Sequence, residues 1–175
     1  TKKPVYVRLI DFERPERNSF VAVNQMRFVR GASVRPDVTL LVNGLPLVHM
    51  EIKSLAQDND WTDATSDLRD YEEAVPRLFF PTLLNVAADT QSFRYGAVGA
   101  KPGFYFPWSK APLKYQDDND LKQATQALLN PRTLLDIALN YVFYEEKEGG
   151  TAKIVPRHMQ YYAVRRLLER IREGD

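Results

Sequence analysis

The sequence predicts a mixed α/β domain, and three observations carry this prediction. Residues 5–10 and 20–29 are rich in β-branched and aromatic side chains that alternate with polar ones, as in strands. Asn43-Gly44 separates two further apolar runs and is typical of a tight hairpin turn. Apolar residues at helical spacing then follow, first within residues 62–75 and later after Asn130-Pro131. These patterns indicate a central mixed sheet flanked by helices.

The composition allows one compact core and excludes several classes of protein. Of the 175 residues 44% are hydrophobic, which is enough to close a core, and the net charge of +1 gives no global attraction to nucleic acid. The absence of cysteine excludes disulfides and thiolate zinc sites, and the only two histidines, His49 and His158, are expected to be ordinary packed or surface residues. No apolar run is long enough for a membrane span, and the lack of cysteine suits a reducing compartment, so we expect a cytoplasmic protein. The chain begins without methionine and ends in a charged run, so we expect it to be part of a longer polypeptide.

The remaining elements follow from local signals. A β-hairpin is expected from residues 38–42 and 45–53, and a helix over residues 62–75 that Pro76 ends. Strands are expected at residues 82–88 and 93–98, with an apolar edge or packed loop at 104–108, and Asn130-Pro131 begins a helix. Gly149-Gly150 marks a charged linker, followed by a helix over residues 158–171. We therefore expect a domain at 1–146, a linker at 147–153 and the start of a second domain at 154–175.

The hairpin brings together residues that can carry chemistry. Side chains at i and i+2 of a strand share a face, so Glu51 and Lys53 project together. Folding about Asn43-Gly44 places Asp37 within roughly one residue of the position opposite Glu51. Mg²⁺ prefers oxygen ligands and is commonly held by one or two carboxylates, which Asp37 and Glu51 supply. The spacing is also compatible with an exposed charged pair on a solvated sheet that does no chemistry.

The amino-acid sequence of the hairpin resembles that of a known family. Its motifs are similar to those of the PD-(D/E)XK nucleases and, more narrowly, of the motor subunit of type I restriction enzymes: Arg35-Pro36-Asp37, then Asn43-Gly44-Leu45-Pro46-Leu47-Val48, then Glu51-Ile52-Lys53. Segments 18–25 and 93–96 extend the resemblance. It implies a restriction-endonuclease-like fold with a catalytic centre of Asp37, Glu51 and Lys53. It also implies that Mg²⁺ is held by the two carboxylates and the backbone carbonyl of Ile52.

Three further residues take roles from this resemblance. The family has a Gln-x-x-x-Tyr motif on the next helix, whose tyrosine corresponds to Tyr71, but position 67 is aspartate here. Asp67 can accept hydrogen bonds as the amide does, but cannot donate them. Residues 157–164 resemble the segment that opens a superfamily 2 helicase-type motor, where Gln160 would bind the adenine of ATP. The chain has no G-x-x-x-x-G-K-[ST] loop, so ATP is expected to act only in a full-length protein.

The resemblance implies Mg²⁺-dependent endonucleolytic cleavage of double-stranded DNA, as in a type I site-specific deoxyribonuclease. The implied partners are duplex DNA and the methyltransferase and specificity subunits of a restriction-modification complex, with no membrane. Asp37, Glu51 and Lys53 favour this interpretation, and the aspartate at position 67 leaves room for an alternative, a noncatalytic DNA-binding or subunit-docking module that keeps the nuclease fold.

Overall fold

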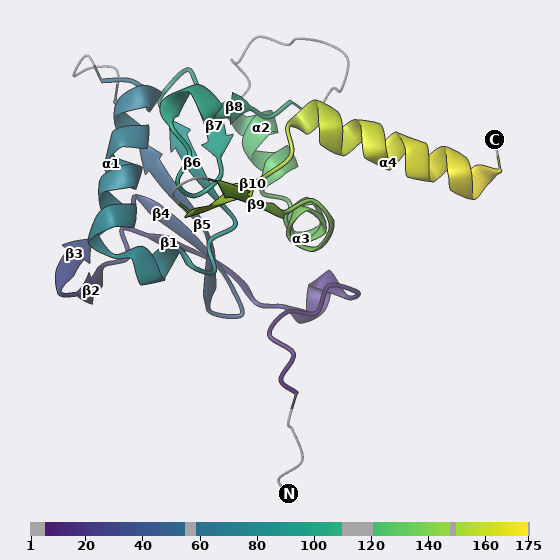
Figure 1. The fold of residues 1–175 in the computed structure, drawn as a ribbon, viewed down its shortest axis with the longest axis horizontal. Helices are drawn as coiled ribbons and strands as arrows, with labels where there is room; N and C mark the ends of the chain where they lie inside the picture. Colours follow the sequence, from purple (N-terminus) through teal and green to yellow (C-terminus); the bar gives the residue numbers. More distant parts are fainter. Residues whose placement is uncertain (1–5, 55–58, 110–120, 148–149, 175) are drawn as a thin grey trace, which may run out of the picture.

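A six-stranded mixed sheet forms the centre of the computed structural model, which describes residues 6–54, 59–109, 121–147 and 150–174 (Figure 1). Its strands lie in the order β1-β4-β5-β6-β7-β8, and only β5 and β6 pair in parallel. The strand bounds are β1 Phe20–Asn24, β4 Val38–Val42, β5 Leu45–Ile52, β6 Leu84–Ala88, β7 Phe93–Gly96 and β8 Phe106–Pro107. The predicted mixed α/β class is confirmed.

The described residues also contain four α-helices, which cover both faces of the sheet (Figure 1). Helix α1 (Trp61–Ala74) makes the crossover between the parallel strands β5 and β6, and lies on one face. Helices α2 (Leu121–Leu128) and α3 (Pro131–Asn140) cover the other face, and α4 (His158–Glu173) projects away from the sheet. None of the described helices is long and apolar enough to cross a membrane.

The sheet separates two hydrophobic clusters. The larger one lies on the side of α2 and α3 and includes Val48, Met50 and Leu134. The smaller one lies under α1 and joins Ala64 and Leu68 of the helix to Ala87 of β6. Because successive residues of a strand face opposite sides, Met50 enters the larger core while its neighbour Glu51 faces α1. The catalytic candidates therefore lie on the α1 face.

The predicted helix starts are confirmed. The Asp60 side chain accepts a hydrogen bond from the Thr62 backbone, while Asp63 accepts one from the Asp60 backbone, which makes a reciprocal cap for α1. The Asn130 side chain caps α3 by accepting from the Arg132 backbone at 3.0 Å.

Several predicted elements differ in the structure. Residues 6–10 form no strand, although their apolar side chains alternate like those of one. The run 20–29 is broken at Gln25, where a positive φ of 49° turns the chain, so it yields β1 and the separate strand β2 (Phe28–Arg30). Strand β2 pairs with β3 (Ala32–Val34) in a small hairpin of its own. Helix α2 was not predicted, because its two turns give too few apolar repeats.

The expected linker also contains regular structure. Strands β9 (Phe143–Lys147) and β10 (Gly150–Ile154) pair antiparallel, so part of residues 147–153 belongs to a hairpin rather than to an irregular connection. Glu145 and Glu146, two of the charged residues that suggested a linker, lie on this two-stranded ribbon and are exposed. Where one domain ends and another begins stays a prediction.

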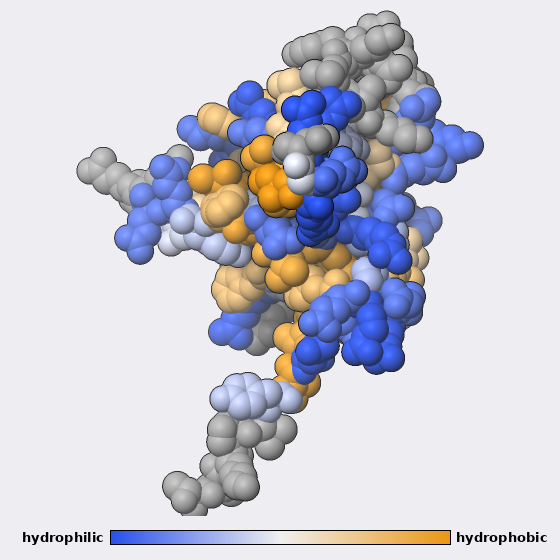
Figure 2. Space-filling model, turned by 90° about the vertical axis from the view of Figure 1, so that its right-hand side faces the viewer, coloured by the Kyte–Doolittle hydropathy of each residue, from blue (hydrophilic) through white to orange (hydrophobic). Residues whose placement is uncertain are grey.

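Helix α4 is attached at its first turns. Tyr161 is buried, packs against Trp108, and donates a hydrogen bond to Asp136 of α3 at 3.0 Å. Further along the helix the apolar residues are exposed: Val164, Leu167, Leu168 and Ile171 are 42–64% exposed. Figure 2 faces this side of the molecule and shows apolar surface exposed between hydrophilic areas. Residues 150–174 thus contribute one hairpin and one helix, which do not by themselves define a motor domain.

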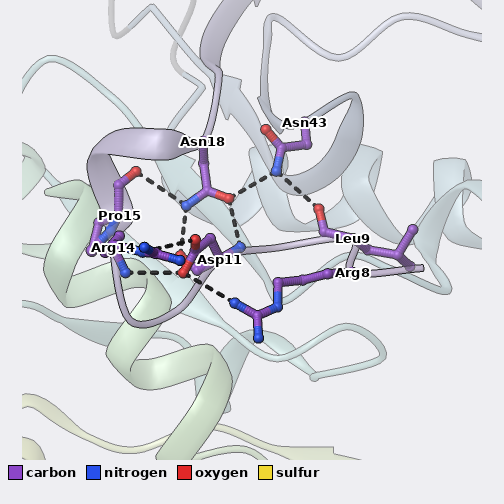
Figure 3. A network of polar contacts seen from close by, with 7 residues as sticks. All are labelled: Arg8, Leu9, Asp11, Arg14, Pro15, Asn18 and Asn43. Carbon is purple, nitrogen blue, oxygen red and sulfur yellow. Dashed lines mark hydrogen bonds and ion pairs between the residues drawn. The ribbon is translucent and has the colours of Figure 1, made fainter. Parts of the chain in front are cut away.

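The turn of the central hairpin is held by the N-terminal segment (Figure 3). Asn43 and Gly44 have φ angles of 50° and 84°, as the predicted tight turn requires. The Asn43 side chain accepts from the Ser19 backbone at 2.7 Å and donates to the carbonyl of Leu9 and to Asn18. Asn18 is itself buried and bonded to both backbone groups of Asp11. This network fixes the closed end of the hairpin.

Asn43→Ala should lower the free energy of unfolding by about 4 kcal/mol, because it loses three hydrogen bonds of about 1 kcal/mol each and puts a Cβ-bearing residue without a local partner at positive φ. Asn43→Gly is the matched control, since it loses the same hydrogen bonds but keeps the positive φ without strain, and should lose only about 3 kcal/mol. Urea denaturation of the three proteins measures both losses. Unchanged unfolding midpoints in both variants would show that the turn does not depend on this network.

Candidate active site

The site is built on a β-bulge between β4 and β5. Near the turn Leu41 pairs with Pro46, but one residue further along Leu40 pairs with Val48, so β5 contains one extra residue, Leu47. The register then continues to the pair Val38 and Met50, which sets Asp37 opposite Glu51. The predicted proximity of these two carboxylates is confirmed.

Without the extra residue Asp37 would lie opposite Met50. A shift of one residue moves a side chain to the other face of a sheet, and Met50 faces the larger hydrophobic core. The bulge therefore decides that Asp37 and Glu51 share the α1 face.

The Asp37 carboxylate is oriented by the backbone of the facing strand. Its Oδ2 accepts a hydrogen bond from the Ile52 N–H at 2.9 Å. Its own backbone carbonyl accepts from the Gln25 N–H at 2.8 Å, which ties the start of β4 to the end of β1. Asp37 is thus held at two points beside Glu51.

Lys53 connects Glu51 to α1. Its backbone N–H donates to the Ala88 carbonyl at 2.8 Å, which continues the pairing of β5 with β6. Its Nζ lies 3.9 Å from Glu51 Oε1 and forms a hydrogen-bonded ion pair with Asp67. The residue that departs from the family motif therefore lies within the site, and it accepts from the lysine as a glutamine oxygen also could.

The carboxylates give the site an unusual protonation state. Burial raises the pKa of Glu51 to about 7, and the negative charges of Asp37 and Asp67 add to this effect. Burial also raises the pKa of the Tyr71 hydroxyl to about 12, again with help from the carboxylates. For Lys53 burial lowers the pKa, but the carboxylates outweigh it and hold that pKa above its ordinary value. A further positive charge bound among Asp37, Glu51 and Asp67 would therefore be attracted by the carboxylates.

The residues present fit a divalent cation with oxygen ligands. Glu51 is 7% exposed, and its Oε2 is buried with no hydrogen-bond partner. A buried carboxylate oxygen without a donor is costly unless a cation or water satisfies it. Among the described residues no group of three or more histidine, cysteine, aspartate or glutamate side chains is arranged to hold a metal. Mg²⁺ needs only one or two carboxylates, so Asp37 and Glu51 suffice.

Two other residues that the sequence analysis considered, His49 and Gln160, are not part of the carboxylate-lysine group. His49 is fully buried on the same face, bonded to Thr39 at 3.1 Å, and burial lowers its pKa to about 4, so it is the packed residue that the sequence indicated. Gln160 lies far along the chain in α4, where its Oε1 accepts from the Arg157 N–H at 2.9 Å. It lines a groove of about 670 Å³ that also includes Tyr141, Phe143 and Pro156.

One neighbour of the site was not singled out from the sequence. Arg35 lies close enough to Tyr71 for its charge to oppose the rise in the pKa of that hydroxyl. Its position two residues before Asp37 was visible in the sequence, but only the fold brings it near Tyr71.

Fold and site together define an α/β domain with a carboxylate-lysine centre on a bulged hairpin. The model of the family "Type I restriction enzyme R protein N terminus" matches residues 1–104. The chain belongs to this family and is the N-terminal domain of a type I restriction enzyme R subunit.

Full-length relatives are much longer than this chain. It is 34% identical over 168 residues to the type I restriction enzyme HindI endonuclease subunit of Haemophilus influenzae, which covers 90% of this chain and 16% of that protein. It is 29% identical to the putative type I restriction enzyme MjaVIIIP endonuclease subunit of Methanocaldococcus jannaschii, over 94% of this chain and 16% of that protein. The chain thus spans about a sixth of the length of these relatives.

The raised pKa of Glu51 should make the stability of the metal-free protein depend on pH. The folded state keeps a proton that the unfolded chain releases near pH 4.5, so stability falls as pH rises from about 4.5 to about 7. The glutamine of Glu51→Gln cannot ionise, so the free energy of unfolding of this variant should rise relative to that of the wild type by up to about 3 kcal/mol over this range. Urea unfolding in EDTA at several pH values measures the difference.

Glu169→Gln, which removes an exposed carboxyl of α4, is the matched control and should keep the wild-type pH dependence. A constant difference between Glu51→Gln and wild type across this range would show that Glu51 is ionised in the fold.

Proposed function

We propose that this chain is the Mg²⁺-dependent DNA-cleaving domain of a type I restriction endonuclease subunit. The observation that carries the proposal is the convergence of Asp37, Glu51 and Lys53 on one face of the bulged hairpin. The parallel pair β5 and β6 with its α1 crossover supports a restriction-endonuclease-like core. We further propose a nuclease domain at 1–146, a linking segment at 147–153, and the start of a motor domain at 154–175.

In this proposal Asp37, Glu51 and the backbone carbonyl of Ile52 hold Mg²⁺. The bound ion would activate a water nucleophile and stabilise charge on the scissile phosphate. Glu51 must lose its proton to act as a ligand, and its pKa of about 7 makes this loss easy at neutral pH once a cation is present. The unpartnered Oε2 of Glu51 supports its role as a ligand.

Lys53 has a different role. An ammonium group is a donor only and cannot coordinate a cation, so Lys53 would donate to a phosphate oxygen or orient the attacking water. Asp67 would hold the lysine toward the site when DNA is absent. Tyr71, on the next turn of α1, would position the phosphate or the lysine through its hydroxyl, which stays protonated because its pKa is about 12.

The partners of the complete protein follow from the family. We propose that it acts on duplex DNA with methyltransferase and specificity subunits in a restriction-modification complex. ATP would be used by the rest of the polypeptide, since this chain contains no phosphate-binding loop. Gln160 is the candidate for contacting adenine, and the groove beside it supports this assignment.

A second candidate is a noncatalytic DNA-binding or docking module with the same fold. The ion pair between Lys53 and Asp67 favours it, because a lysine held by a carboxylate is less available to phosphate. Substitutions that separate cleavage from movement along DNA distinguish the two candidates.

Asp37→Ala or Glu51→Ala in the complete enzyme should reduce DNA cleavage at least a hundredfold while ATP-driven translocation continues near the wild-type rate. Loss of a metal ligand stops hydrolysis but leaves the motor unchanged. Linearisation of a closed circular plasmid with one target site measures cleavage, and triplex displacement measures translocation. Glu73→Ala, which removes an exposed carboxylate from the last turn of α1, is the control and should cut normally. Full cleavage by both site variants would refute the metal assignment.

A further inference from the structure

The small β2–β3 hairpin lies next to the candidate site but outside the six-stranded sheet. It immediately precedes Asp37 and packs against α1 on the same face (Figure 1). We propose that its outer face is a docking surface for the phosphate backbone of duplex DNA, which leads one strand over Asp37 and Glu51. This inference rests on the proposed function and adds the path by which the substrate reaches the site.

The inner face of the hairpin is fixed to the strand that carries Glu51. The Phe28 ring makes an edge contact with the ring of His49, with centroids 6.0 Å apart. Val34 is 4% exposed, so the second strand is anchored as well. His49 lies two residues before Glu51 on the same face of β5. Any group bound on the outer face of the hairpin is therefore held in a defined place relative to the carboxylates.

The outer face presents cationic and hydrogen-bonding groups. Val29 and Ser33 pair on this side, while Arg27 comes just before β2 and Arg35 just after β3; all four are exposed. Arg27 donates through its Nε to the Ser33 hydroxyl at 2.9 Å, which orients the guanidinium across the hairpin. A guanidinium has four further N–H donors in a planar fork that matches phosphate geometry. Val29 is 68% exposed on the same hairpin and carries no charge that would repel a phosphate.

Arg35 links this face to the site itself. Arg35 comes two residues before Asp37 in the chain, so the backbone keeps the two residues within about 7 Å of each other. A phosphate bound by Arg35 would be next to the groups that surround Glu51.

The charges on the two sides of the site differ. Residues 17–36 contain four arginines and no acidic residue. Helix α1 on the other side exposes the carboxylates Asp63, Asp70 and Glu73 and a single cation, Arg69. Duplex DNA carries one negative charge per roughly 1.7 Å of its axis, so it avoids the acidic helix and follows the basic hairpin. A chain with a net charge of only +1 needs such a local surface to bind DNA.

The arginines on the outer face take no part in the hydrophobic clusters, so their removal should leave the fold intact. The test compares Arg27→Gln/Arg35→Gln with wild type in binding a short fluorescent duplex, by anisotropy over a series of KCl concentrations. Ca²⁺ is present as the hard cation for the carboxylates. The matched control is Lys122→Gln/Arg132→Gln, which removes two exposed charges from α2 and α3 on the opposite face.

The hairpin variant should bind every duplex sequence more weakly, and its plot of log K against log salt should be shallower by up to about 2, because each lost phosphate contact removes about 0.9. The control should keep the wild-type slope. Equal slopes in the wild type and the hairpin variant, or no duplex binding by the wild type at low salt, would overturn the proposal.

A second measurement does not depend on affinity. A photo-crosslinking amino acid at Val29 should attach to duplex DNA, whereas the same group at Leu139, which is 57% exposed on α3, should not. No adduct at position 29, or equal adducts at both positions, would also overturn the docking surface. Neither result affects the metal assignment, which fails only if the Asp37 and Glu51 variants still cut DNA.

Discussion

The candidate site depends on one extra residue in β5. Because Leu47 is added on that strand, the register of the hairpin shifts, and Asp37 lies opposite Glu51 instead of Met50. The same shift allows the Ile52 N–H to orient the Asp37 carboxylate. At the other end of the hairpin Asn43 holds the turn through the N-terminal segment (Figure 3). The geometry of the carboxylates is thus set by the pairing of two strands, and sites built on strands are more precise than sites on loops.

Converging carboxylates destabilise a metal-free fold, and the structure offsets this cost in two ways. Glu51 keeps a proton to a pKa of about 7, and Lys53 lies between Glu51 and Asp67. Both arrangements can change when a cation binds, because Glu51 can release its proton and Lys53 can turn toward a phosphate. Asp67 therefore fits a site that is balanced without metal, and its carboxylate accepts the same hydrogen bond as the family's glutamine oxygen.

Much of the fold and the hairpin could be predicted from the sequence, but the bulge could not. Asn43-Gly44 identifies the turn, and Glu51 and Lys53 alternate as a strand requires. Leu47 is apolar and suits a buried strand in either register, so residue types alone left Asp37 uncertain by one position. Residues 6–10 look like a strand but find no partner edge, and the apolar stripe of α4 is exposed because little of the described chain covers it. Tertiary pairing decides these features, and local patterns do not record it.

The central claim is that Asp37 and Glu51 bind a divalent cation together. It is tested most directly by diffraction from crystals of the protein soaked in Mn²⁺, with anomalous scattering to locate the ion. We expect a peak between the two carboxylates, within bonding distance of Glu51 Oε2, and no peak in crystals of Glu51→Gln. Ordered crystals of the wild type with no anomalous peak at this position, or a peak that persists in Glu51→Gln, would contradict the claim.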